Sequence, residues 1–118
     1  MTSSSSTTTA ADVFEMIERK KELPTIVEGK RDRAALKALG FTDIHELDAA
    51  LFHVVERFGK GARIQILTDL DSEGKKLYRK LSSDLRQRGV FIDDELRELL
   101  FKTQLRQIEG LVSYLNKQ

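Results

Sequence analysis

The fold of this chain is decided by one stretch, Arg63-Ile64-Gln65-Ile66-Leu67-Thr68-Asp69-Leu70-Asp71-Ser72-Glu73-Gly74. Its apolar half, residues 64–67, has the length and composition of a buried β-strand. Asp69 and Asp71 come soon after this strand, and a helical pattern begins at Lys75. The stretch therefore predicts a strand whose carboxyl end delivers acidic side chains into a strand-to-helix loop, which is where open α/β sheets place their chemistry.

The spacing of Asp69 and Asp71 has two interpretations. Two carboxylates this close repel each other unless a cation lies between them, and Mg²⁺ is commonly held by one or two carboxylates together with phosphate oxygens. Alternatively, Asp71 or Ser72 caps the following helix, because a side-chain oxygen there accepts a backbone N–H and an acid suits the helix dipole. A second acidic motif elsewhere in the chain is needed to favour the metal site.

Composition limits the class of protein. The 118 residues are 33% charged and 40% hydrophobic with a net charge of +1, which predicts one soluble globular domain. Any surface for nucleic acid must then be a local basic patch. There is no cysteine, which excludes disulfides and thiolate metal sites and favours a reducing, cytoplasmic compartment. An apolar run of about 20 residues and a signal-peptide pattern are both missing, so no membrane partner is expected.

Apolar periodicity predicts alternating strands and helices behind a Ser/Thr-rich tail. Residues 1–9 should be disordered, because this tract has nothing to bury, and residues 10–118 should form the domain. The expected elements are a leading helix at 10–21, strands at 25–27, 42–45, 64–67 and 90–92, a helix with Asp32 as its N-cap, helices at 47–58 and 75–88, and helices from Asp94 and Leu111. This order predicts a single compact α/β domain, with a mostly parallel sheet of about four strands flanked by helices.

A second strand-end acid, Glu28, follows the predicted strand Thr25-Ile26-Val27. Because parallel strands place their carboxyl ends at the same edge of a sheet, Glu28 should lie near Asp69 and Asp71. Two strand-end acid motifs in so short a chain favour a site over two unrelated turns. We therefore expect three carboxylates to converge on one Mg²⁺ or Mn²⁺ ion.

With both motifs in hand, the chain resembles the Toprim family. Residues 27–36, Val-Glu-Gly-Lys-Arg-Asp-Arg-Ala-Ala-Leu, look like the first Toprim motif in the form seen in bacterial primases and the ribonuclease M5 group. Residues 68–74 look like the second motif, and their Glu-Gly ending is similar to that of type IA topoisomerases. The likeness spans residues 25–115. The small stand-alone Toprim proteins of archaea look like the closest overall match, since residues 90–93 and 109–114 also resemble their ending.

The resemblance implies Mg²⁺-dependent phosphodiester chemistry on RNA or DNA, either cleavage or primase-like nucleotidyl transfer. Carried over by motif, Glu28 is a general acid/base or metal ligand, Asp69 and Asp71 hold the metal, and Glu73 is an outer-shell acid. The chain carries no pattern for a zinc module or a topoisomerase tyrosine domain, so strand passage is not expected. As an alternative, the domain is a non-catalytic Toprim module that binds nucleic acid, or protein partners of RNA or DNA processing, in a larger complex.

Basic residues beside both acidic motifs form a candidate path for a phosphate backbone. They are Lys30, Arg31, Lys75, Lys76 and Arg79. The alternative for the last three is a solvated helix face, which is what most charge runs are. A rival enzyme class is a phosphatase with the first aspartate as nucleophile. That pattern normally opens a domain, whereas here it lies in the middle of the chain.

Overall fold

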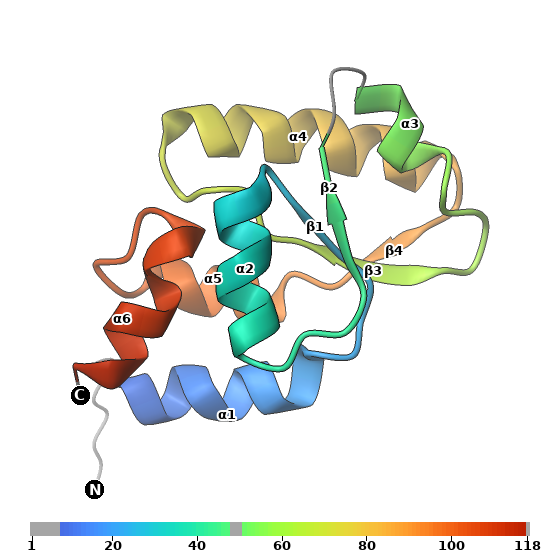
Figure 1. Cartoon of the computed structure of the whole chain (residues 1–118). Helices are drawn as coiled ribbons and strands as arrows, with labels where there is room; N and C mark the ends of the chain where they lie inside the picture. Colours follow the sequence, from blue (N-terminus) through green and yellow to red (C-terminus); the bar gives the residue numbers. More distant parts are fainter. Residues whose placement is uncertain (1–7, 48–50, 118) are drawn as a thin grey trace, which may run out of the picture.

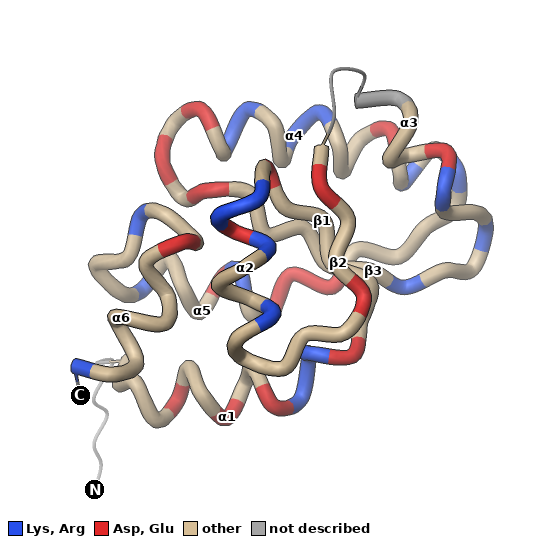
Figure 2. Tube along the Cα trace, viewed as in Figure 1, with Lys and Arg blue, Asp and Glu red and all other residues tan. Residues whose placement is uncertain are grey.

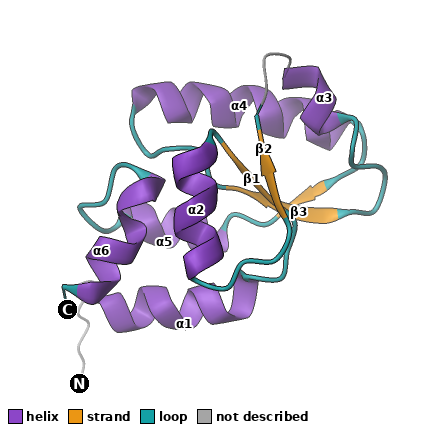
Figure 3. Cartoon of the chain, viewed as in Figure 1, coloured by secondary structure: helices purple, strands orange, loops and turns teal. Residues whose placement is uncertain are grey.

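The computed structural model describes residues 8–47 and 51–117 of the chain (Figures 1 and 3). Within these ranges the elements follow the order α1 (Ala10–Lys20), β1 (Thr25–Val27), α2 (Lys30–Ala38), β2 (Ile44–Glu46), α3 (Leu51–Val55), β3 (Arg63–Ile66), α4 (Ser72–Gln87), β4 (Phe91–Ile92), α5 (Glu95–Phe101), the 3-10 helix η1 (Ile108–Gly110) and α6 (Leu111–Asn116). Strands and helices alternate from β1 to α5, as the sequence predicts.

The sheet is parallel throughout its described strands, in the order β2-β1-β3-β4. Ile26 of β1 lies opposite Ile66 of β3, and Ile64 of β3 lies opposite Ile92 of β4. The two central strands are therefore β1 and β3, and their carboxyl ends are neighbours. The α/β class and the four-stranded parallel sheet predicted from the sequence are confirmed.

Two hydrophobic cores lie on the two faces of the sheet. Ile26 and Ile66 pack into a core with α3 and α4, whereas Val27 and Leu67 pack into a core with α1, α2, α5 and α6. Neighbouring residues of a strand point to opposite faces, so this division follows from the two-residue period. Figure 1 shows the same arrangement, with α3 and α4 together on one side of the sheet.

The prediction that Asp32 caps a helix is wrong. Helix α2 begins at Lys30, and its N-cap is Gly29 in an extended conformation. Asp32 lies in the first turn instead, where its Oδ2 accepts the Gly29 N–H at 3.2 Å. An acid in the first turn that reaches back to the N-cap N–H is one half of a capping box. The helix therefore starts immediately after Glu28 and Gly29.

The helix predicted at 47–58 is shorter than its apolar pattern suggests. Leu47 is not helical, because its N–H donates to the Val27 carbonyl at 2.9 Å and so continues the pairing of β2 with β1. Helix α3 ends at Val55, and the Phe58 N–H then donates to the Val55 carbonyl in a turn. Residues 48–50 lie outside the described residues.

The predicted tail falls mostly on residues 1–7, which also lie outside the described residues. Thr9 is the N-cap of α1: its Oγ1 accepts the Asp12 N–H at 3.2 Å, and its own N–H donates to Asp12 Oδ2 at 3.0 Å. Among the described helices, none has the length and apolar character needed to cross a membrane.

Candidate active site at the carboxyl edge of the sheet

The first acidic side chain comes from the loop after β1 and reaches the loop after β3. Glu28 follows the last residue of β1, and its Oε2 accepts the Asp69 N–H at 2.7 Å. The pairing continues beyond β3, since the Leu67 N–H donates to the Ile26 carbonyl at 2.8 Å. The two strand-end motifs thus meet, as expected for adjacent parallel strands.

The Asp69 loop is held in place from the C-terminal part of the chain. Asp69 Oδ1 accepts the Ile108 N–H at 2.8 Å, and the Leu70 N–H donates to the Arg106 carbonyl at 2.8 Å. On the other side, the Arg97 guanidinium donates to the Thr68 carbonyl at 2.7 Å and to the Asp69 carbonyl at 3.2 Å. Arg97 is only 4% exposed. A buried cation thus fixes the backbone that carries the acid.

The second aspartate, Asp71, is the N-cap of α4, where its Oδ1 accepts the Gly74 N–H at 2.8 Å. The capping interpretation is therefore correct for this residue, and the other carboxylate oxygen remains for another partner. Gly74 packs directly on the acidic loop, because a Cβ at this position would lie 1.9 Å from the Asp69 carbonyl oxygen. Thr68 Oγ1 also donates to the Gly74 carbonyl at 2.7 Å. Only glycine fits where the helix meets the loop.

A fourth carboxyl group, that of Asp32, joins the edge from α2. Asp32 is buried, and burial together with the charge of Asp69 raises the pKa of Asp32 to about 6. Burial likewise raises the pKa of Glu28. The hydrogen bond from the Asp69 N–H lowers this pKa in part, and the charges of Asp69 and Asp71 raise it further. Burial also raises the pKa of Asp69, against the opposing effect of the Ile108 N–H. These acids are costly to ionise together, because they repel one another in a partly desolvated place.

In the described part of the chain, no compensating cation is in direct contact with Glu28, Asp69 or Asp71. Within residues 8–47 and 51–117, no ion pair joins Glu28, Asp69 or Asp71 to a lysine or arginine. In the same ranges, no group of three or more His, Cys, Asp or Glu side chains is arranged to enclose a metal ion. The carboxylate oxygens nevertheless fit Mg²⁺, which prefers hard oxygen ligands and binds through one or two carboxylates, keeping waters or phosphate oxygens elsewhere. The donor set suits a loosely held ion and not a closed metal cage.

The predicted basic residues lie on two helices beside this edge. Lys30 and Arg31 are exposed in the first turn of α2, and Lys75, Lys76 and Arg79 are exposed on α4. Figure 2 shows lysine and arginine positions in blue along both α2 and α4. Glu73, the predicted outer-shell acid, is exposed in the first turn of α4.

Sequence reasoning missed Arg97 and the position of Asp32 in the site. Arg97 lies on the buried side of α5, together with Leu96 and Leu100. A helical projection of residues 95–101 would have shown a cation on this apolar face. Asp32 falls one helical turn after Glu28, which would have placed both acids at one helix start. The Ile108 N–H left no signal, since any residue offers a backbone donor.

The class of protein defined by these features is a small parallel α/β domain with carboxyl groups gathered where its central strands end. The chain belongs to the UPF0292 protein family. It is 32% identical over 117 residues to a UPF0292 protein of Methanocaldococcus jannaschii, which covers 90% of this chain and 91% of that protein. It is also 37% identical over 100 residues to one of Pyrococcus horikoshii, covering 80% and 76%. No protein-family profile matches the chain.

A solved structure of a protein from Aquifex aeolicus has the same fold. It superposes with a TM-score of 0.76 and covers 85% of this chain and 95% of its own, at 24% sequence identity. At this identity, the similarity extends to the fold alone.

Proposed function

We propose that this protein is a Toprim-like domain that carries out Mg²⁺-dependent phosphodiester chemistry on nucleic acid at the edge formed by Glu28, Asp69 and Asp71. The observation that carries the proposal is the hydrogen bond of 2.7 Å from the Asp69 N–H to Glu28, which joins two strand-end acids. The raised pKa values of Glu28 and Asp69 support it, because perturbed carboxyl groups that lack a paired cation are typical of functional sites.

In this proposal each acid has a separate task. Asp69 and Asp71 hold the ion through the oxygens that do not accept backbone N–H groups. When bound, Mg²⁺ (or Mn²⁺) polarises a phosphoryl oxygen and offsets charge on the leaving oxygen. Glu28 accepts the proton of the attacking hydroxyl or water, or returns one to the leaving oxygen, because its raised pKa brings it nearer to neutral pH. The Asp69 N–H fixes the orientation of the Glu28 carboxylate.

The basic residues on α2 and α4 bind the phosphate backbone. Lys30, Arg31, Lys75, Lys76 and Arg79 are all exposed, so they can contact phosphates without sequence preference. Replacing one of these residues with alanine should weaken binding about equally for all sequences. The slope of log affinity against log salt should fall by roughly one for each lost phosphate contact. An unchanged slope would remove these residues from the interface.

A second candidate is a non-catalytic module that binds nucleic acid or a protein within a larger complex. Two observations favour it: Asp71 already caps α4, and the described residues contain no ready group of three metal ligands. Both candidates use the same surfaces, so an assay of products must separate them.

The assay incubates the full chain with labelled RNA and DNA, with and without nucleoside triphosphates, in Mg²⁺, Mn²⁺ or a chelator. Shortened products identify a nuclease, extended products identify nucleotidyl transfer, and retarded but unaltered strands identify the binding module. Glu28→Gln and Asp69→Asn should reduce turnover by about 10²- to 10⁴-fold, whereas Glu15→Gln on the exposed side of α1 should not. Turnover that survives Asp69→Asn would place the chemistry elsewhere.

A further inference from the structure

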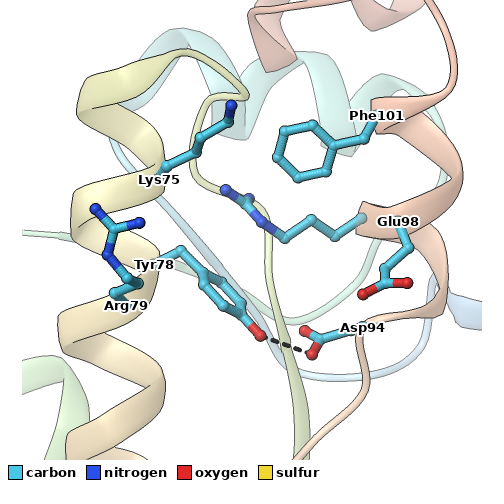
Figure 4. A pocket seen from close by; sticks show the side chains of 7 residues that line it. Lys75, Tyr78, Arg79, Asp94, Glu98 and Phe101 are labelled. Atoms are coloured by element: carbon cyan, nitrogen blue, oxygen red, sulfur yellow. Dashed lines mark hydrogen bonds between the residues drawn. The ribbon is translucent and has the colours of Figure 1, made fainter.

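A separate pocket lies between α4 and α5, next to the acidic edge. Its volume is about 290 Å³, near the lower end of the range for small-molecule sites. One wall is α4, with Lys75 and Arg79, and the other is α5, with Asp94 and Glu98 (Figure 4). The pocket is therefore cationic on one side and anionic on the other.

The third component of the pocket is a stack of flat side chains. The Arg97 guanidinium lies 4.6 Å from the centre of the Tyr78 ring and 5.2 Å from the centre of the Phe101 ring. Figure 4 shows Tyr78 on the α4 side of the pocket and Phe101 on the α5 side, and the Arg97 guanidinium contacts both rings. Because Arg97 also donates to the Thr68 and Asp69 carbonyls, the stack directly adjoins the acidic loop. Flat aromatic and guanidinium groups of this kind are what nucleobases stack against.

The anionic wall has an unsatisfied acceptor. Asp94 Oδ2 accepts the Tyr78 hydroxyl at 2.6 Å, and Arg86 lies 3.6 Å from the same oxygen. Asp94 Oδ1 is buried and accepts no hydrogen bond in the part of the chain that the structure describes. Buried polar atoms normally have a partner. The Asp94 side chain lines the pocket and is 28% exposed, so a ligand N–H group can reach this carboxylate, and Glu98, one turn further along α5, can accept a second hydrogen bond.

We propose that this pocket binds a guanine nucleotide, with its base edge against Asp94 and Glu98 and its phosphate against Lys75 and Arg79. Ionised carboxylates only accept hydrogen bonds, and guanine alone among the bases presents two adjacent donors, N1–H and N2–H₂, on its pairing edge. Adenine and cytosine each place an acceptor beside their amino group, which a carboxylate repels. The volume of the pocket suits one base, and its polarity matches a donor edge at one end and an anion at the other.

The inference deepens the proposed function. The role of the pocket in a reaction rests on that function, whereas nucleotide binding does not. Lys75 lies one helical turn after Asp71, so a nucleotide in the pocket would place its phosphate near the acidic edge. The pocket then selects the base beside the phosphodiester that reacts. Binding itself needs no metal and can be measured separately from turnover.

The test is an NMR titration of the ¹⁵N-labelled full chain with GMP, AMP, CMP and UMP in the presence of a chelator. GMP should shift the amides of Lys75, Tyr78, Asp94 and Phe101, and it should bind at least about tenfold more tightly than the other three, as expected for one hydrogen bond to a charged group. Equal affinities for the four nucleotides, or shifts confined to other regions, would overturn the proposal.

Variants identify the groups that recognise the base. Asp94→Asn should reduce GMP affinity by about tenfold or more, to the level of AMP. Glu98→Gln offers the same test at an exposed position if Asp94→Asn does not fold. The matched control is Glu95→Gln, which lies on α5 outside the pocket and should leave GMP affinity unchanged. If Asp94→Asn and Glu98→Gln both bind GMP as the wild type does, the assignment of the anionic wall is wrong.

Two further arms separate this inference from the proposed function and identify the source of the ligand. Asp69→Asn should retain GMP binding in chelator, so failure of the turnover assay with intact GMP binding refutes only the proposed function. The reverse result refutes only the pocket. An oligouridylate with one central guanine, compared with one without, shows whether a strand or a free nucleotide binds more tightly. No preference for guanine in either form contradicts the proposal.

Discussion

Asp69 and Asp93 follow neighbouring parallel strands, β3 and β4, yet their surroundings are opposite. Asp93 has a side chain that is 3% exposed, and it accepts from Lys20 Nζ at 2.9 Å and from Arg63 at 3.4 Å. Burial alone would raise the pKa of Asp93, but the hydrogen bonds from Lys20 and from the Glu95 N–H outweigh it and lower the pKa below its usual value. Among the described residues, Asp69 has only a backbone partner for its carboxylate, and burial raises its pKa.

The comparison separates an acid that is paired with cations from one that is held by backbone N–H groups. A buried carboxylate that stabilises a fold carries its own counter-charge, as Asp93 does with Lys20. At the Asp69 edge, cations are replaced by backbone N–H groups, which orient the carboxylates without neutralising them. Such an arrangement costs stability and leaves the acids ready for an external cation. The acidic loop is therefore held by its backbone, whereas Asp93 is held by ion pairs.

The largest effect on stability is expected from Gly74→Ala, which disrupts the contact between α4 and the backbone of the acidic loop. The new Cβ would lie 1.9 Å from the Asp69 carbonyl oxygen, so α4 or the loop must move. We expect the free energy of unfolding to fall by about 4 kcal/mol or more, at the extreme of single-substitution effects. Gly59→Ala is the matched control, because its Cβ would meet nothing within 4 Å. Chemical denaturation measures both, and similar losses in the two variants would refute the role of the contact.

Lys20→Met tests the other side of the comparison. It removes the main counter-charge of Asp93 and leaves that buried carboxylate with the more distant Arg63. Breaking a buried ion pair from one side typically costs 3–5 kcal/mol, and we expect about 3 kcal/mol because Arg63 remains. Lys37→Met on the exposed face of α2 should change stability by about 0.5 kcal/mol at most. If Lys20→Met is no worse than Lys37→Met in denaturant, Asp93 does not depend on its cation.

Asp32→Asn should stabilise the protein at neutral pH, by about 2 kcal/mol. The folded pKa of Asp32 is about 6 and its ordinary value is 3.8, so the folded state binds more protons than the unfolded state between these values. Wild-type stability should therefore rise as pH falls from 7.5 towards 4.5, and the advantage of Asp32→Asn should shrink over the same window. The contribution of Asp93 to stability depends on pH in the opposite direction, since it is present above pH 3.8 and is lost below it.

Urea unfolding of wild type and variant at several pH values measures this difference. Asp84→Asn is the control, since its partner Lys80 is on the surface, and its effect should be small and nearly independent of pH. An advantage of Asp32→Asn that stays constant between pH 7.5 and 4.5 would mean that Asp32 ionises normally.

Much of the fold could be predicted because its signals are local. The apolar run of residues 64–67, the glycine turns and the helical periods each specify an element without reference to the rest of the chain. The errors arose where a hydrogen bond with the backbone, distant or close, decides the structure. Leu47 fits a helical period but pairs with Val27 instead. Asp32 has the chemistry of an N-cap, yet the N-cap is Gly29, three residues earlier, and the Asp32 side chain reaches back to its N–H.

For the site, the positions of the acids could be predicted, but their partners could not. Strand order alone brings Glu28 to Asp69, because carboxyl ends of adjacent parallel strands are neighbours. What supports or neutralises each acid could not be predicted. Lys20 binds Asp93 across 73 residues of sequence, and Ile108 binds Asp69 across 39. Such long-range partners leave no periodic signal, so the sequence indicated three strand-end acids, Glu28, Asp69 and Asp71, without showing that Asp93 is paired with a cation.

The most direct test of the central claim is a titration of the ¹⁵N-labelled chain with substoichiometric Mn²⁺, whose unpaired electrons broaden nearby amide signals. Because the Asp69 edge has no paired cation among the described residues and Asp93 has one, the amides of Gly29, Leu70 and Ile108 should broaden first. The amide of Glu95 should remain sharp. Without phosphate, the dissociation constant for Mn²⁺ should be in the millimolar range, on the order expected for an ion that keeps most of its waters. The broadening should disappear in the Asp69→Asn/Asp71→Asn double variant. Earlier broadening of Glu95, or the same pattern in the double variant, would contradict the assignment of the metal site.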